Sequence, residues 1–155
     1  MRIAKQRSAM TLVELMIVMA IIGLLSGILI PVAKMAIQYR ENSLAAHQLR
    51  TAIQAFELYR GETGGYPPDQ SRGITPPEMV EYFEYFEIDW WGEVTDIGGK
   101  WDWDNGNNFA YSVTIADPTR KQKQLKKLDK MIDDGSLSAG KFRSVGSRYH
   151  YILEE

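Results

Sequence analysis

The feature that most constrains this chain is an apolar run from Ser8 to Val32 with one charged side chain, the carboxylate of Glu14. After Glu14, no charge occurs until Lys34. At about 1.5 Å of rise per residue, this uncharged stretch is long enough to cross the hydrocarbon core of a bilayer as one helix. Cations before a span favour a cytoplasmic N-terminus, and three precede this one: Arg2, Lys5 and Arg7. The sequence therefore predicts a single membrane span, with everything after Lys34 outside the cytoplasm.

Glu14 is the residue that an ordinary membrane anchor would not carry. A carboxylate in a membrane helix costs about 2–3 kcal/mol at the helix centre and less near an end, so we expect it to have a partner. No Lys, Arg or His lies within one helical turn of it. The partner would come from a second molecule, or from a new amino terminus made by cleavage between Arg7 and Glu14.

The residues before Glu14 resemble the processing site of type IV prepilins and type II secretion pseudopilins. The resemblance is strongest in the segment Ala9-Met10-Thr11-Leu12-Val13-Glu14-Leu15 and weakens toward residue 67. In that family a short basic leader ends in a small residue, usually Gly. A membrane peptidase cuts after it and methylates the new N-terminus, and a Glu occupies the fifth mature position. Here Ala9 stands in place of the Gly and Met10 in place of the usual Phe.

The resemblance implies boundaries and residue roles. Residues 1–9 would be the leader, residues 10–33 the transmembrane and filament-core helix, and residues 34–155 a pilin-like head outside the cytoplasm. Cleavage would follow Ala9 and methylation would modify Met10. Glu14 would then pair with the amine of a neighbouring subunit during assembly.

The same resemblance implies partners and a location. The partners would be other copies of the chain and other pilin-like subunits, the prepilin peptidase and an inner-membrane assembly platform. The protein would lie in the inner membrane with a periplasmic head, and in an extracytoplasmic filament after assembly. We expect no nucleic-acid partner, since the formal net charge is −2 and general binding to nucleic acid needs a positive field.

We expect a structural subunit rather than an enzyme. The chain has no Cys, and neither His47 nor His150 lies in a sequence pattern of nucleophilic catalysis. Many type IV pilins close a C-terminal loop with a disulfide, so the lack of Cys favours a type II secretion pseudopilin that drives protein export across the outer membrane. Two alternatives stay open. One is a type IV pilus subunit for adhesion, motility or DNA uptake, and the other is a single-pass anchored binding protein that does not polymerise.

Beyond the membrane the helical pattern continues. Apolar residues recur at steps near three and four, which predicts one amphipathic helix from about Thr11 to Arg60. The residues expected on its apolar face are Val32, Ala36, Tyr39, Ala46, Leu49, Ile53 and Phe56. Its weak points should be Gly23, Gly27 and Pro31, because glycine is a poor helix former and Pro31 cannot donate to the helix hydrogen bonds.

The rest of the chain predicts a small sheet with short helices. A capping-box spacing at Thr75–Glu78 and an N-cap at Asp117 predict two helices. Asn105-Gly106 is a strong hairpin turn between alternating strands, and residues 149–153 alternate like a last strand. The predicted fold class is α+β and pilin-like: a long N-terminal helix packed on a small antiparallel sheet with extra short helices.

Calcium is the one cofactor that the sequence suggests. Carboxylate and amide oxygens suit this hard cation, and they cluster in two places: Asp102, Asp104, Asn105 and Asn107 around the hairpin, and Asp133 and Asp134 before a glycine. Major pseudopilins, which the chain resembles, bind calcium with a C-terminal loop. Turn chemistry alone also explains Asp and Asn at such positions.

Two charged segments and a tryptophan cluster carry alternative interpretations. Residues 120–130 are strongly basic and residues 78–96 strongly acidic. They predict two solvated faces, a complementary contact between neighbouring subunits, or, for the basic segment, DNA capture. The four tryptophans between residues 90 and 103 predict a head core, or an exposed pair that binds a partner or a glycan.

Overall fold

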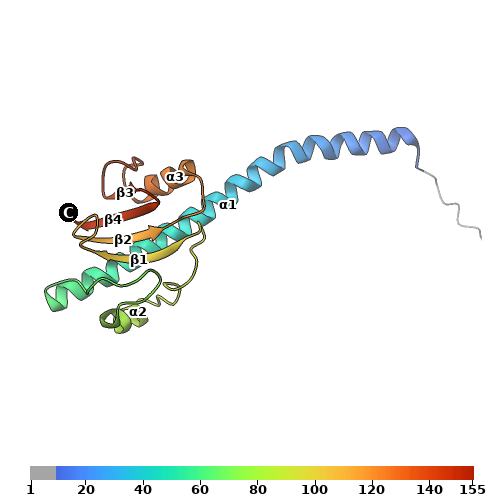
Figure 1. Ribbon diagram of the computed structural model, residues 1–155. Coiled ribbons are helices and arrows are strands. Elements are labelled where there is room, and N and C mark those ends of the chain that lie inside the picture. Colours follow the sequence, from blue (N-terminus) through green and yellow to red (C-terminus); the bar gives the residue numbers. More distant parts are fainter. Residues whose placement is uncertain (1–9) are drawn as a thin grey trace, which may run out of the picture. The chain divides into compact units, whose positions relative to one another are not determined.

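The computed structural model describes residues 10–155. Their elements are α1 (Leu12–Thr63), the 3₁₀ turn η1 (Pro77–Met79), α2 (Val80–Tyr85), β1 (Lys100–Asn105), β2 (Tyr111–Ala116), α3 (Gln122–Ile132), β3 (Phe142–Val145) and β4 (Arg148–Glu154) (Figure 1). The chain divides into two compact units, with the boundary between Ile37 and Gln38. Helix α1 runs through that boundary, so each unit is described by itself.

In the first unit the helix is exposed on all sides. Every described residue up to Ile37 is exposed except Ser26, which is half-buried. By length and composition α1 is apolar enough to cross a membrane. Pro31 lies inside this helix, and no atom lies within 4 Å of where a Cβ on Gly23 or Gly27 would stand. Packing within this unit therefore does not require either glycine.

The head is built on a four-stranded antiparallel sheet. Its strand order is β1-β2-β4-β3. Because side chains alternate between faces along a strand, the pairings Trp103↔Val113 and Val113↔Tyr151 place three apolar side chains on one face. The polar residues between them lie on the other face. The predicted pilin-like α+β fold is confirmed, whereas the short strand β3 was not predicted from the sequence.

The core lies between that apolar face and the second half of α1. Ala45, Leu49 and Ala52 on the helix are fully buried, and the small alanines allow a close approach to the sheet. Phe56 stacks on Trp103 with ring centroids 4.0 Å apart and planes 12° apart, a geometry that adds to the burial of area. Three of the four tryptophans are buried at 1% exposure: Trp91, Trp101 and Trp103.

The helix face and two helix starts differ from the sequence prediction. Burial of α1 begins at Asn42, whereas Tyr39 is 66% exposed, because the head covers only the later turns. Asp117 does not cap α3: the N-cap is Lys121, and Asp117 lies in a preceding turn with a φ of 52°. The expected capping box at Thr75–Glu78 does not form either, since Pro76 is the N-cap of η1 and no side chain caps it.

Candidate functional site

The start of α1 is closed by a reciprocal pair of residues. The carboxylate of Glu14 accepts a hydrogen bond from the backbone N–H of Thr11 at 2.7 Å and from its hydroxyl at 2.8 Å. In return, the hydroxyl of Thr11 accepts one from the backbone N–H of Glu14 at 3.3 Å. This is a capping box, which satisfies backbone donors that a helix start would otherwise leave unpaired.

The partner expected for Glu14 from the sequence was ionic, whereas the partner in the structure is the neutral Thr11. The signal was present, because Thr-x-x-Glu is the spacing of a capping box. Met10, the expected first mature residue, is 63% exposed. Ala9, the expected cleavage residue, lies outside the described residues, as does the rest of the leader. Glu14 follows Met10 by four residues, and its carboxylate points toward the N-terminal end of the helix, where it contacts Thr11.

A second candidate site lies where α3 ends. Asp129, Asp133 and Asp134 can each direct one carboxylate oxygen so that these atoms all lie within 4.8 Å of one another. The Asp133 carboxylate accepts the backbone N–H of Lys141 and, at 3.2 Å, that of Phe142. Asp134 and Asp133 were predicted from the sequence, whereas Asp129 was not.

Asp129 is the member of this cluster that a simple turn does not explain. It is fully buried, and neither carboxylate oxygen has a hydrogen-bond partner of normal geometry among the described residues. Burial raises its pKa to about 6; the nearby Asp134 and Asp133 charges add to the rise, and the backbone N–H of Gly135 opposes it. A buried carboxylate without a partner is costly, and a hard cation would satisfy it.

The turn that follows α3 leaves no space for a side chain at residue 140. A Cβ on Gly140 would stand 2.0 Å from the Oδ2 of Asp133, and the φ of Gly140 is +71°. Both facts require glycine there.

The donor set of Asp129, Asp133 and Asp134 fits a calcium ion in its chemistry, because all three offer carboxylate oxygens.

The acidic residues of the hairpin lie in a different environment. On the face of the sheet away from α1, the guanidinium of Arg148 donates to Asp102, and it donates to both oxygens of Asp104 at 3.0 Å. Asp102 and Asp104 are buried at 5% and 2% exposure. The cation that these two carboxylates face is therefore an arginine of β4.

The two asparagines predicted with them separate. The side-chain amide of Asn105 donates to the carbonyl of Pro67 at 3.0 Å, whereas that of Asn107 donates to Asp104 at 3.0 Å. Asn105 thus ties β1 to the segment that follows α1. Asn107, from the β1–β2 loop, covers the Asp104 side of the cluster.

His150 also belongs to this cluster, although no sequence pattern marked it as a site residue. It is fully buried, with its Nδ1 at 2.8 Å from the hydroxyl of Thr114 and 3.5 Å from the Asp104 carboxylate. Burial lowers the pKa of His150, although Asp104 opposes that effect. Burial, with Asp104 as the next cause, raises the pKa of Asp102 to about 6.

Comparison with known proteins places the first site in a family context. Residues 4–30 match the family model of the prokaryotic N-terminal methylation motif. Searches of curated proteins and of solved structures gave no match to the chain. The motif is characteristic of structural, non-enzymatic subunits, and it implies processing by a prepilin peptidase and assembly with pilin-like subunits. The chain therefore carries the N-terminal methylation motif that is typical of type IV pilins and type II pseudopilins, on a pilin-like α+β fold.

Proposed function

We propose that this protein is a filament subunit that serves as a type II secretion pseudopilin, anchored in the inner membrane until it assembles. The observation that carries the proposal is Glu14, a carboxylate inside a methylation motif at the start of an exposed apolar helix. That helix has no partner within its own unit of the described chain. It needs an apolar surrounding, which lipid supplies before assembly and neighbouring helices supply afterwards.

The proposed mechanism has three steps. Cleavage after Ala9 creates an amine on Met10. The carboxylate of Glu14 in one subunit attracts the Met10 amine of a neighbour, in a medium where charges are poorly screened. Apolar helices then pack side by side as the filament core, while residues 34–155 form the filament surface. Because desolvation offsets much of the attraction between buried charges, the pair acts chiefly to set the stagger between helices.

Two other functions compete with secretion. A type IV pilus subunit would use the same cleavage and the same core helix, and the choice of secretion rests on the lack of cysteine in the chain. A single-pass anchored protein that binds a ligand would need neither cleavage at Ala9 nor a charge at Glu14. Neighbouring genes for a secretion ATPase and a secretin, with several similar leaders, would favour secretion.

Leader processing is the first test of the proposal. Mass spectrometry of the protein extracted from membranes should show an N-terminus at Met10 carrying a methyl group. The replacement Ala9→Gly should be processed at least as well, because glycine is the residue that the peptidase usually meets in the family that this chain resembles. An intact Met1, or an N-terminus beyond Ala33, would contradict the prepilin assignment.

We further propose that the head binds calcium at the end of α3. Asp129, Asp133 and Asp134 would hold the ion, and the ion would neutralise the buried, unpartnered carboxylate of Asp129. The other predicted set, Asp102 and Asp104 with Asn105 and Asn107, is the weaker candidate, because Arg148 already pairs with both carboxylates.

The replacement Asp129→Asn should remove both the cost of a buried charge and the binding of calcium, and the two effects can be measured separately. In a chelator at pH 7, the full chain in detergent should become more stable by about 1 kcal/mol, because no buried charge remains. Calcium at about 100 times its dissociation constant should stabilise the wild type by about 2.7 kcal/mol and the variant hardly at all. Thermal unfolding followed by tryptophan fluorescence measures both. Asp89→Asn, which removes an exposed carboxylate elsewhere, should keep the calcium effect, and equal melting of the wild type with calcium and with chelator would refute the site.

A further inference from the structure

We propose that neighbouring heads bind one another head-to-tail, with the basic face of α3 in one copy seated in an acidic groove beside α2 in the next. The inference rests on the proposed filament and names the contact between its heads. It is carried by two surfaces of opposite charge on this chain, neither of which has an ionic partner in the described residues.

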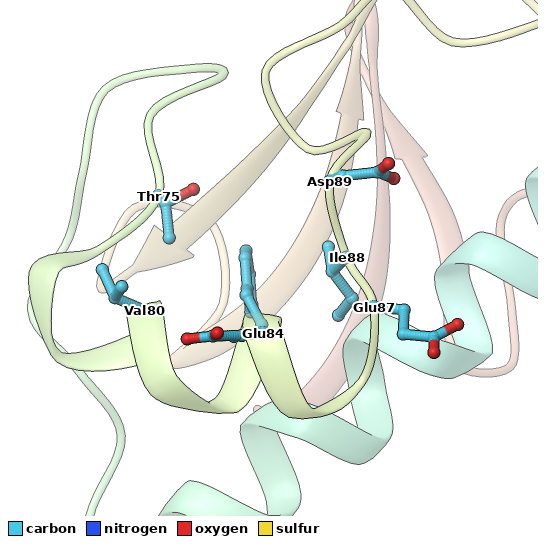
Figure 2. Close-up of a pocket in the computed structure, with 7 residues that line it drawn as sticks. Thr75, Val80, Glu84, Glu87, Ile88 and Asp89 are labelled. Carbon is cyan, nitrogen blue, oxygen red and sulfur yellow. The ribbon is translucent and has the colours of Figure 1, made fainter.

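The acidic groove lies beside α2 and has a volume of about 410 Å³. Figure 2 shows Val80 and Ile88 in its apolar lining, with the Glu84 carboxylate on the Val80 side and the carboxylates of Glu87 and Asp89 directed away on the other side. Val80 is 54% exposed although it is apolar. The groove is therefore an apolar floor with a negative rim.

The carboxylates of this rim have no cation of their own. Glu84, Glu87 and Asp89 are all exposed. Within residues 10–155, the Lys and Arg side chains that lie within 4 Å of a carboxylate contact other acids. Three exposed carboxylates without a cation give this groove a negative field, which favours a cationic partner.

The basic face belongs to α3. It consists of residues spaced at i, i+3, i+4 and i+7, which share one side of a helix, and all of them are exposed: Lys123, Lys126, Lys127 and Lys130. On the opposite side, Leu125 and Leu128 are buried in the core. Among the described residues, none of the four lysines pairs with a carboxylate, whereas Arg120, just before the helix, pairs with Glu41.

Lysine fits the groove in chemistry as well as in sign. Its four-carbon stem covers apolar surface while the ammonium group remains at a polar edge. Lysines from α3 would lay their stems over the exposed Val80 and bring their charges to the rim. A membrane surface or a nucleic acid could bind the lysines, but either would leave the acidic groove without a partner. A second copy of this chain satisfies both surfaces.

The two surfaces lie at opposite edges of the head. Helix α2 packs beside the β1 edge, through Phe83 on Trp91 and Trp91 on Trp101. The end of α3 is tied to the β3 edge, where Asp133 accepts the N–H of Phe142. Figure 1 shows α2 and α3 on opposite sides of the sheet-packed half of α1. A contact between opposite edges uses two different patches, so it repeats from copy to copy instead of stopping at a closed dimer, and it builds an open helical array when the rotation does not close into a ring.

Cross-linking of the full chain in cells tests the contact directly. The natural chain has no Cys, so a thiol-specific bismaleimide reacts only with introduced residues. The double variant Glu84→Cys/Lys127→Cys should give a ladder of cross-linked multimers. Each single variant alone should give almost none, and the two single variants expressed together should stop at dimers. A matched pair, Glu84→Cys with Asn107→Cys on the β1–β2 loop, should give no ladder.

Charge exchange then tests whether the attraction is electrostatic. When Lys123→Glu/Lys126→Glu or Glu87→Lys/Asp89→Lys is added to the Cys pair, the ladder should fall at least about tenfold, because like charges then face one another. Combining the two sets should restore most of it. Failure of the combination to restore the ladder, or an equal ladder from the matched pair, would overturn the contact. Filaments assembled from the Glu84→Cys/Lys127→Cys variant that give no ladder would overturn the contact while leaving the proposed function intact, whereas a lack of wild-type filaments would refute the proposed function.

Discussion

Replacing Glu14 by Leu is expected to exclude the subunit from the filament almost completely while leaving its membrane level unchanged. The apolar run from Leu15 to Val32 suffices for insertion, and a leucine near the start of the span makes insertion easier. Assembly should fail because the attraction between the Glu14 carboxylate and a neighbour's Met10 amine is gone. Co-expression with the wild type, followed by shearing of filaments from the cells, measures the share of each subunit in the polymer.

The capping box supplies the matched control for this experiment. Glu14 also caps its own helix through Thr11, so Glu14→Leu removes a cap as well as a charge. Glu14→Gln keeps the cap, since glutamine serves in a capping box, but it removes the charge. Exclusion of both variants would support the ionic role. Normal recovery of the Gln variant beside loss of the Leu variant would show that the cap matters and the ionic pair does not, and equal recovery of all three subunits would refute both.

The second large effect is expected at Arg148. Replacing it by Met should destabilise the head by about 3–5 kcal/mol, because Asp102 and Asp104 would remain buried without their cation. Urea unfolding of the full chain in detergent, followed by tryptophan fluorescence, measures the loss. Arg72→Met is the control: its ion pair with Asp117 is largely exposed, so we expect a loss below about 1 kcal/mol.

The loss at Arg148 should depend on pH in a definite direction. Burial and Asp104 already raise the pKa of Asp102 to about 6, and Arg148 opposes that rise. Without Arg148 the folded state holds a proton on the Asp102 carboxyl that the unfolded chain, with a pKa near 3.9, has released. Stability of the variant then falls as the pH rises through this range. The destabilisation should therefore be smaller at pH 5 than at pH 8, and adding Asp102→Asn should recover part of it. A loss that is equal at both pH values would contradict the role of the buried carboxylates.

Local patterns allowed much of the fold to be predicted. The apolar run and its amphipathic continuation predicted α1, and Asn105-Gly106 predicted the hairpin. The helix expected after Asp117 corresponds to α3, although it begins later than expected. These signals depend on neighbours in the sequence. The four residues of β3 gave no such signal, since a strand that short becomes visible only through its pairing with β4.

The buried polar residues could not be predicted in the same way. Arg148 reaches Asp102 across β2, and that contact depends on the register of three strands. Asp129 lies among lysines in the sequence, which indicates a solvated helix residue. Its burial results from the folding of the chain beyond α3, where Asp133 bonds to Lys141. The capping box at Thr11 is the exception, because its spacing was readable and was overlooked in favour of an ionic partner.

The exposure of α1 in the first unit has an energetic consequence for a subunit that changes surroundings. Lipid tails and neighbouring apolar helices are nearly equivalent solvents for leucine and isoleucine side chains, so moving such a helix from one to the other changes its hydrophobic free energy little. The transfer is then close to a balanced partition. A few polar interactions that differ between bilayer and filament decide in which direction the helix moves. When those interactions are lost, the helix can return to the bilayer. A fibre built on such a helix would be able to return its subunits to the bilayer without unfolding the head.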